Sequence, residues 1–359
     1  MLKTARALSW WAAIPPLTAI VLVLAWGRPL SNPAIVLVAA ALIAAVVVAV
    51  HHAEIVAHRV GEPFGTLILA IAVTVIEVGL IIMLMTSAGS GPSPLARDTV
   101  FAAFMIVCNG VVGLCLLVGA LRHREVEFHV EGVTAALATL SAVATLALVL
   151  PSFTISAPGP TYSGPQLAFA GVASLVLYAS FVFVQTVRHR DYFLPVDTGE
   201  DHHADPPTRK AAVLSLVLLL VCLVVVVGLA KIEAPAIEKA VVAVGAPHAV
   251  VGVAIALLVL LPETAAAVRA ASRNRVQTSF NLALGSALAS IGLTIPSLAV
   301  ASIWLPNTLI LGLSPKDMVL LAITLIVTVL TVAPGRATLM QGMVHLTLFG
   351  VFLFLSFVP

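Results

Sequence analysis

Long apolar segments recur along the whole of this chain, and they constrain its fold more than any other feature. A helix needs about 20 apolar residues to cross a bilayer. The 359 residues are 61% hydrophobic and only 9% charged, a balance not found in soluble globular proteins of this length. The sequence therefore predicts an all-α integral membrane protein. We expect eleven spans, at about residues 9–27, 33–52, 64–87, 98–121, 131–151, 165–188, 211–230, 242–262, 277–303, 317–334 and 338–357.

The N-terminus and the cysteines both favour a chain that stays in the membrane. Lys3 and Arg6 precede an apolar run, as in a signal peptide, but no small-x-small cleavage site follows, so we expect a retained first helix. Cys108, Cys115 and Cys222 all lie within apolar spans. They are therefore interpreted as small buried apolar residues and not as a disulfide framework.

The distribution of Lys and Arg predicts the orientation, because cytoplasmic loops carry an excess of both. With a cytoplasmic N-terminus and alternating spans, the outside set has five members and the cytoplasmic set thirteen. The C-terminus is then outside, and the net charge of +2 reflects topology and gives no indication of nucleic-acid binding. The cytoplasmic set is Lys3, Arg6, Arg59, Arg122, Arg124, Arg188, Arg190, Arg209, Lys210, Arg269, Arg273, Arg275 and Arg336; the outside set is Arg28, Arg97, Lys231, Lys239 and Lys316.

The longest hydrophilic stretch, residues 188–210, divides the predicted spans into one leading helix plus five, and then five more. Because five is odd, two halves of five helices insert with opposite topology, as in many secondary transporters. We therefore predict a leading helix (1–30), a first repeat (31–190), a linker (191–210) rich in acidic residues and His, and a second repeat (211–359). The linker is expected to be a solvated loop, with a cation sensor as the alternative.

Two carboxylates, Glu77 and Glu263, interrupt long apolar segments at matched places, in the second span of each half. A charge at that depth costs about 2.5–3.5 kcal/mol on insertion scales, so such a residue indicates a functional site. The alternative is a carboxylate satisfied by a neighbouring helix. The repeat symmetry predicts that both lie near the bilayer midplane.

Polar and helix-weakening residues accompany both glutamates. Thr74 precedes Glu77, and Pro262 immediately precedes Glu263. Proline removes a backbone donor and frees a carbonyl, which is tolerated in the membrane where it lines a cavity or packs on protein. Carboxylate and carbonyl oxygens suit calcium, magnesium or sodium. A simple proline kink is the alternative interpretation.

The spans that follow offer neutral oxygen donors. Asn109 lies in an otherwise apolar segment of the fourth span. Ser286 and Ser290, at i and i+4, share one face of the ninth span with Gly285 nearby. Close helix packing is an equally good explanation for the small residues.

A second group of polar residues follows the second predicted span on the cytoplasmic side. Glu54, His58 and Glu62 belong to it, and it forms either a solvated interfacial cluster or a cation vestibule with a proton relay. His248 and His345 are expected to be satisfied core or interfacial groups, with a pH-reporting role as the alternative. In that alternative, His248 belongs with the vestibule and the proton relay.

Two segments resemble the α-repeats of bacterial calcium/proton antiporters of the cation/calcium exchanger superfamily. They are GEPFGTLILAIAVTVIE (61–77) and LPETAAAVRAASRNRVQTSFNLALGSALASIGLTIP (261–296). The resemblance covers nearly the whole chain, and it is best to the branch that exchanges calcium, sodium or potassium for protons. It implies that Glu77 and Glu263 bind the cation, and that Gly285, Ser286 and Asn109 occupy family site positions.

The family's asparagines are absent from both motifs. Members often have Gly-Asn-Ala-Thr-Glu and Gly-Asn-Ala-Ala-Glu, whereas this chain has Thr74 and Leu260 at those positions. Two amide oxygens are therefore missing, which leaves room for sodium or potassium in place of calcium.

The resemblance and the paired carboxylates together predict a cation/proton antiporter, in the first place for calcium. The chain has no G-x-x-x-x-G-K-[ST] motif, so an ion gradient is the expected energy source. Sodium or potassium exchange is the alternative on the same site, and a channel without proton coupling is the alternative class. A metalloenzyme would need a His/Cys cluster, and no such cluster is evident, so we expect neither an enzyme nor a cofactor. We expect residence in a bacterial inner membrane, with a homo-oligomer left open.

Overall fold

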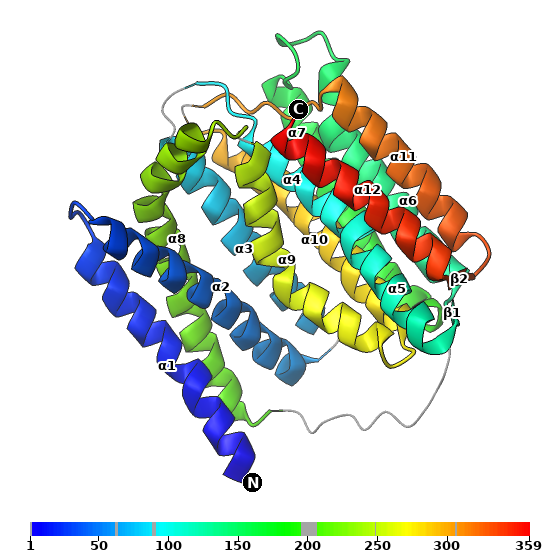
Figure 1. The fold of residues 1–359 in the computed structure, drawn as a ribbon, viewed down its shortest axis with the longest axis horizontal. Coiled ribbons are helices and arrows are strands. Elements are labelled where there is room, and N and C mark those ends of the chain that lie inside the picture. The colour runs from blue at the N-terminus through cyan, green and yellow to red at the C-terminus, as the bar shows by residue number, and fades with distance from the viewer. Residues whose placement is uncertain (1, 62–63, 88–90, 195–206, 248, 306) are drawn as a thin grey trace. The chain divides into compact units, whose positions relative to one another are not determined.

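The computed structural model describes residues 2–61, 64–87, 91–194, 207–247, 249–305 and 307–359, and these are almost entirely helical (Figure 1). They form two compact units, each made of two stretches of sequence. The first unit comprises residues 1–90 and 203–246, and the second comprises residues 91–202 and 247–359. Each unit is described below by itself.

The first unit consists of four long helices. They are α1 (Leu2–Ala25), α2 (Asn32–Val60), α3 (Phe64–Ser87) and α8 (Arg209–Val244). Helices α2, α3 and α8 pack against one another, and α1 packs on α2 and α8. Glycines allow close approach, as is usual between membrane helices. A Cβ at Gly79 would lie 2.8 Å from Val227 Cγ2, and one at Gly228 would lie 2.7 Å from Leu22 Cδ1.

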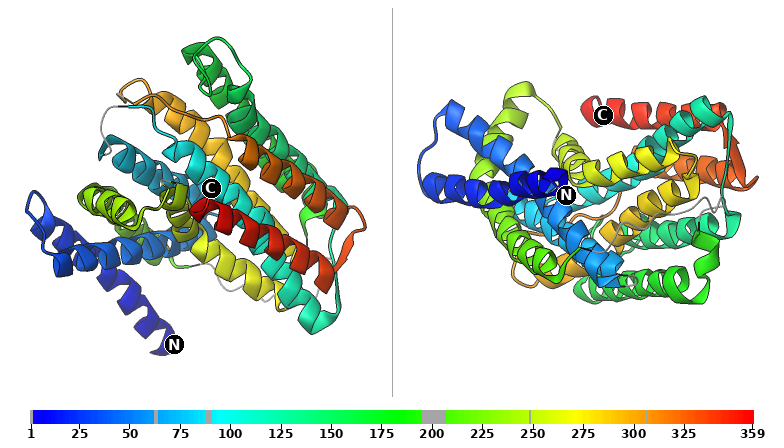
Figure 2. Two further views of the ribbon diagram at one scale, coloured as in Figure 1. Left: turned by 45° about the horizontal axis from the view of Figure 1, so that its top comes forward. Right: turned by 90° about the horizontal axis from the view of Figure 1, so that it is seen from below.

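The second unit begins with one continuous helical segment, α4 (Leu95–Met105), the π-helical turn η1 (Ile106–Val111) and α5 (Val112–His123). In Figures 1 and 2 this segment runs beside α12, and α11 and α12 are also neighbours. The remaining elements of the unit are β1 (Glu125–Glu127), α6 (Val130–Ala144), η2 (Thr145–Val149), η3 (Leu150–Ser152), α7 (Gly164–Phe183), η4 (Val184–Arg188), η5 (Arg190–Phe193), α9 (Ala249–Ala271), α10 (Val276–Ala301), α11 (Pro315–Val332), β2 (Arg336–Thr338) and α12 (Leu339–Phe357).

A two-stranded antiparallel sheet joins two connections of the second unit. Val126 of β1 lies opposite Ala337 of β2, and Arg336 Nε lies 3.4 Å from Glu125 Oε1. Because β1 follows α5 and β2 precedes α12, the sheet fixes the ends of two helices that also contact each other along their lengths.

The predicted all-α membrane fold is confirmed. The described residues contain eleven long helical segments, as expected, and ten of these are long and apolar enough to cross a membrane. In α1, the apolar stretch Trp11–Ala25 is shorter than the spans of the other ten segments. The chain is therefore an integral membrane protein. The division into two inverted repeats remains a prediction.

Several predicted helix boundaries are wrong. Helix α2 continues from residue 52 to Val60, α8 continues from residue 230 to Val244, and α9 begins at Ala249 instead of residue 242. Charged side chains end an apolar run but do not end a helix, because the backbone hydrogen bonds continue regardless of polarity. Gly245, at φ +64°, follows the end of α8 in the left-handed conformation that glycine adopts without strain.

Candidate functional site

Glu77 lies near the middle of α3, in the first unit, and only 2% of it is exposed. Thr74, one turn earlier, is also buried, and its hydroxyl donates to the carbonyl of Ala70 at 2.8 Å. That bond uses the hydroxyl proton and leaves oxygen lone pairs available as acceptors. Two residues beyond Glu77, Gly79 brings α3 close to α8. The sequence thus places a carboxylate and a hydroxyl oxygen on a tightly packed part of one helix.

Glu263 lies near the middle of α9, in the second unit, and is half-buried. The helix continues through Pro262, which has no N–H to donate to the carbonyl four residues earlier. Both ends of α9 are held by neighbours. Ser279 of α10 donates to the carbonyl of Ala267 at 2.7 Å, and a Cβ at Gly252 would lie 2.8 Å from the backbone of Asp98 in α4. The helix that carries Glu263 is therefore anchored on either side of the carboxylate.

Asn109 lies fully buried in the π-helical turn η1 and forms the centre of a polar network. Its Nδ2 donates to Thr324 Oγ1 of α11 at 2.8 Å. Its Oδ1 lies 3.2 Å from Nδ1 of His345, and Nε2 of that histidine lies 3.1 Å from Thr331 Oγ1. These contacts assign the Nδ1–H tautomer to His345, with Thr331 donating to its other nitrogen. Single-turn π-bulges occur frequently at functional sites.

Glycines allow this network to form. A Cβ at Gly113 would lie 2.9 Å from the Cβ of His345, and one at Gly342 would lie 2.7 Å from the backbone nitrogen of Leu117. Helices α5 and α12 therefore approach one another closely where His345 meets Asn109. The expectation that His345 is a satisfied core residue agrees with these contacts. The partner Thr324, however, carries no signal in the sequence that singles it out.

The predicted small residues of α10 differ in burial. Ser290 is 3% exposed, whereas Gly285 and Ser286 are half-exposed, and no atom lies within 4 Å of where a Cβ at Gly285 would be. Helix α10 packs against α9 and against η1. The second unit thus brings the helices of Glu263, Asn109 and Ser286 together.

Two of the predicted vestibule residues lie within α2 and not after it. Glu54 and His58 are exposed, one helical turn apart on the same face. His52 is buried instead, with Nδ1 3.3 Å from Ser215 Oγ and Nε2 3.3 Å from the carbonyl of Trp11. It therefore joins α2 to α8 and α1. The other two predicted vestibule residues, Glu62 and His248, lie outside the described residues.

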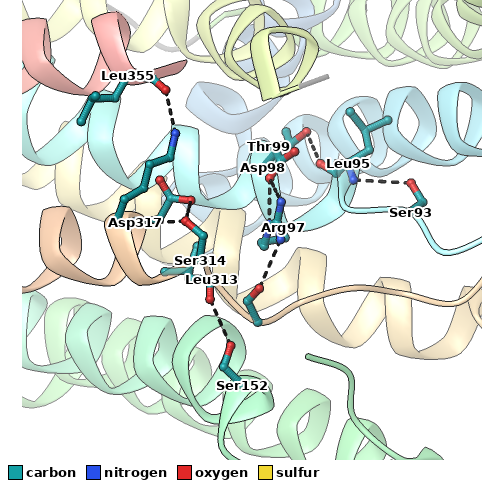
Figure 3. A network of polar contacts seen from close by, with 12 residues as sticks. Ser93, Leu95, Arg97, Asp98, Thr99, Ser152, Leu313, Ser314, Asp317 and Leu355 are labelled. Carbon is teal, nitrogen blue, oxygen red and sulfur yellow. Dashed lines mark hydrogen bonds and ion pairs between the residues drawn. The ribbon is translucent and has the colours of Figure 1, made fainter. Parts of the chain in front are cut away.

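A further polar cluster of the second unit joins the start of α4 to the segment before α11, and it was not predicted (Figure 3). Arg97 donates to Asp98 Oδ1 at 2.8 Å and to the carbonyl of Gly312 at 3.3 Å. Ser314 donates to Asp317 Oδ2 at 2.6 Å, and Lys316 donates to the carbonyl of Leu355 at 2.7 Å. The only sequence signal is a charged pair at the start of each of two spans.

Arg97, Asp98, Lys316 and Asp317 also line a cavity of about 270 Å³. Because two basic side chains balance two acidic ones in its wall, this cavity suits a structural role or an entrance better than a binding site for one bare cation. Within the described part of the chain, no three His, Cys, Asp or Glu side chains are grouped as metal ligands.

The chain matches known proteins over most of its length. The family described as sodium/calcium exchanger protein matches residues 30–187 and 214–358. A relative from Sinorhizobium fredii, named as the ionic transporter y4hA, is 47% identical over 353 residues, which are 97% of this chain and 96% of the relative. The sodium-potassium/proton antiporter ChaA of Escherichia coli is 31% identical over 351 residues, which are 95% of this chain and 94% of that one.

The fold is likewise similar to a solved structure. The crystal structure of the H+/Ca2+ exchanger CAX superposes with a TM-score of 0.70 at 16% identity, and the match covers 98% of this chain and 88% of that chain. At this identity the likeness concerns the fold.

Proposed function

Because this chain belongs to the sodium/calcium exchanger protein family, we propose that it exchanges a cation, in the first place calcium, for protons by alternating access. The family consists of secondary transporters and not of enzymes, in agreement with the absence of a nucleotide-binding motif from the sequence. Proton coupling is supported by the names of two similar proteins, a sodium-potassium/proton antiporter and an H+/Ca2+ exchanger. The expected location is a bacterial inner membrane.

One observation carries the proposal: each of two membrane helices has a carboxylate near its middle. Glu77 in α3 and Glu263 in α9 hold matched places in the two predicted repeats. Since intramembrane acidic residues mark ion and proton pathways, we assign one half of a shared cation site to each. In this proposal, both glutamates bind the cation and, alternatively, the protons that replace it.

The chemistry of two carboxylates explains exchange without a separate energy-coupling domain. Two negative charges in a poorly hydrated site repel each other strongly unless they are compensated. One divalent cation compensates both charges, and two protons do the same. Occupancy by calcium and occupancy by protons are therefore mutually exclusive, and release of one permits binding of the other on the opposite side of the membrane.

Neutral oxygens would complete the cation's coordination. Ser286 lies beside the open space at Gly285, and the amide oxygen of Asn109 has a second lone pair besides the one directed at His345. Thr74 supplies a further hydroxyl oxygen near Glu77. We assign the exposed pair Glu54 and His58 to a cytoplasmic vestibule that attracts cations and passes protons.

Exchange of sodium or potassium for protons is the second candidate, and two observations favour it. Thr74 and Leu260 replace the amide oxygens typical of the family, and Leu260 is 2% exposed and offers no oxygen from its side chain. The relative with 31% identity over nearly the whole chain is named a sodium-potassium/proton antiporter. A site with fewer hard oxygens discriminates less strongly in favour of a divalent ion.

Purified protein in vesicles with an imposed pH gradient tests the proposal. Calcium, sodium and potassium are added separately while an internal dye reports the pH. We expect calcium to dissipate the gradient at the lowest concentration; activity with sodium or potassium alone would establish the second candidate. Cation flux without any proton movement would indicate a channel and would overturn antiport.

A further inference from the structure

A cavity of about 460 Å³ opens in the first unit, where the turn between α1 and α2 meets the C-terminal part of α8. Figure 1 shows these helices in blue and green. The volume falls within the range of about 300–1,000 Å³ typical of small-ligand pockets. Its wall combines apolar side chains with three cations. The residues are Ala25, Trp26, Gly27, Arg28, Leu30, Ile35, Lys231, Ile232, Pro235, Ala236 and Lys239.

Close contact between two helices builds this cavity. Gly228 brings α8 against Leu22 of α1. Lys231 follows Gly228 one turn later on α8, and Trp26 follows Leu22 just beyond the end of α1. As a result, Lys231 Nζ lies over the indole ring of Trp26, 5.3 Å from its centroid. The chain then turns away at Gly27, whose φ of +69° suits glycine. The arrangement is therefore set by backbone packing and is not a chance meeting of long side chains.

The charge of the cavity is entirely positive. Of the residues that the structure describes, Arg28, Lys231 and Lys239 line it, and no acidic residue does. Among the described residues, none of the three cations takes part in an ion pair. The predicted orientation makes this concentration unusual, because these are three of only five Lys and Arg residues expected on the outer face.

The depth of the cavity follows from the length of α8. Between Lys210 and Lys231 lie twenty residues without a charge, which span about 30 Å, the thickness of the hydrocarbon core. Lys231 therefore lies where the acyl chains meet the headgroups. Trp26, which is 53% exposed, is of the residue type enriched at that level. The remaining turns of α8, with Lys239, extend through the headgroup layer.

We propose that this cavity binds the headgroup of an anionic phospholipid. Arg28, Lys231 and Lys239 would bind the phosphate, and Ile35, Ile232 and Pro235 would contact the glycerol backbone and the first carbons of the acyl chains. A bound lipid would join α1 to α8. The proposal does not depend on which cation is transported.

Native mass spectrometry tests this binding. The intact protein is extracted from nanodiscs of phosphatidylglycerol and phosphatidylcholine, and the retained lipid is quantified. We expect preferential retention of phosphatidylglycerol. Each of the changes Arg28→Gln, Lys231→Gln and Lys239→Gln should weaken it about fivefold, because one cation near an anionic surface contributes that order of affinity. Lys231→Arg keeps the positive charge, so it should retain phosphatidylglycerol as well as the unchanged protein does.

Lys210→Gln is the matched control, since it removes one charge from the opposite end of the same helix. An equal loss of phosphatidylglycerol in Lys210→Gln would show general electrostatic attraction and overturn the site. Retention unaffected by the three Gln variants would also overturn it. Displacement of the lipid by millimolar inorganic phosphate would identify a soluble anion as the occupant and contradict the lipid assignment.

Discussion

A carboxylate within a membrane helix is a costly residue, and Glu77, Glu233 and Glu263 differ in their context. Glu77 and Glu263 were predicted from the sequence because each interrupts an uncharged segment. Glu233, which is 6% exposed in α8, was missed because the apolar run ends two residues earlier, at Lys231, and the segment was assigned to a loop. Burial of a carboxylate depends on the neighbouring helix, which one sequence does not show. Only the first two hold matched places in the predicted repeats.

Thr74→Asn should strengthen calcium binding relative to sodium. The change supplies an amide oxygen one turn before Glu77, where the family often has asparagine. An increase in calcium affinity of about fivefold is expected, equivalent to about 1 kcal/mol. Competition between the two cations in the vesicle assay measures it. Thr86→Asn, the same change at an exposed position of α3, is the control, and equal effects of the two variants would remove Thr74 from the site.

Asn109 and His345 should be energetically coupled even without a transported cation. A double-mutant cycle with Asn109→Leu and His345→Leu should give a coupling energy of about 0.5–3 kcal/mol in thermal unfolding, because the side chains share a buried hydrogen bond. As a control, the same double-mutant cycle is measured for Asn109 and Thr139, which lies on α6. If the two leucine variants were strictly additive, the network would not support the site as we describe it.

At the scale of helices, the sequence predicted the number of membrane helices and the position of their centres. It did not predict where some of the helices end or where their hydrogen-bonding pattern is irregular. The uncharged runs predicted α3 and the middle of α9, whereas the extension of α8 beyond residue 230 was missed. The π-helical turn at Asn109 was not predictable either. It accompanies contacts with Thr324 and His345, which lie 215 and 236 residues away in the sequence. Such geometry depends on tertiary packing and leaves no local pattern.

Gly113→Ala should destabilise the packing of α5 on α12. The added methyl group would lie 2.9 Å from His345 Cβ and 3.0 Å from the backbone nitrogen of Leu346, so one helix must shift. Overpacking of this kind costs about 1–3 kcal/mol. Gly350→Ala, also on α12, meets no atom within 4 Å and should be neutral or slightly stabilising. Equal unfolding temperatures for the two variants would contradict the close approach.

At the scale of the whole molecule, the chain combines a sequence division into repeats with a different division into compact units. The predicted repeats separate at the linker, on either side of which the family match also lies. The compact units instead group residues 1–90 with 203–246, and the rest together. Sequence symmetry concerns how the chain is built along its length, whereas compactness concerns which helices pack, so neither division follows from the other.

The predicted topology places the C-terminus outside the cytoplasm. A phosphatase reporter fused after Pro359 should be active, because it folds only in the outer compartment, and the same reporter inserted in the linker should be inactive. The thirteen-to-five distribution of Lys and Arg is the reason for this expectation. Inactive reporters at both places would mean that the number of spans after the linker is even, and the opposite pattern of activity would mean that the whole orientation is inverted.

Calcium/proton exchange by Glu77→Gln and Glu263→Gln protein in vesicles tests the central claim most directly. Each change keeps the side-chain shape but removes one negative ligand and one titratable proton, so exchange should fall to background in both variants. The Asp variants should keep weak exchange with lower affinity, because the charge remains while the carboxylate retracts. Glu233→Gln is the control, because it changes a different buried glutamate of a membrane helix, and it should exchange normally. Near-normal exchange in either Glu77→Gln or Glu263→Gln would contradict the shared two-carboxylate site.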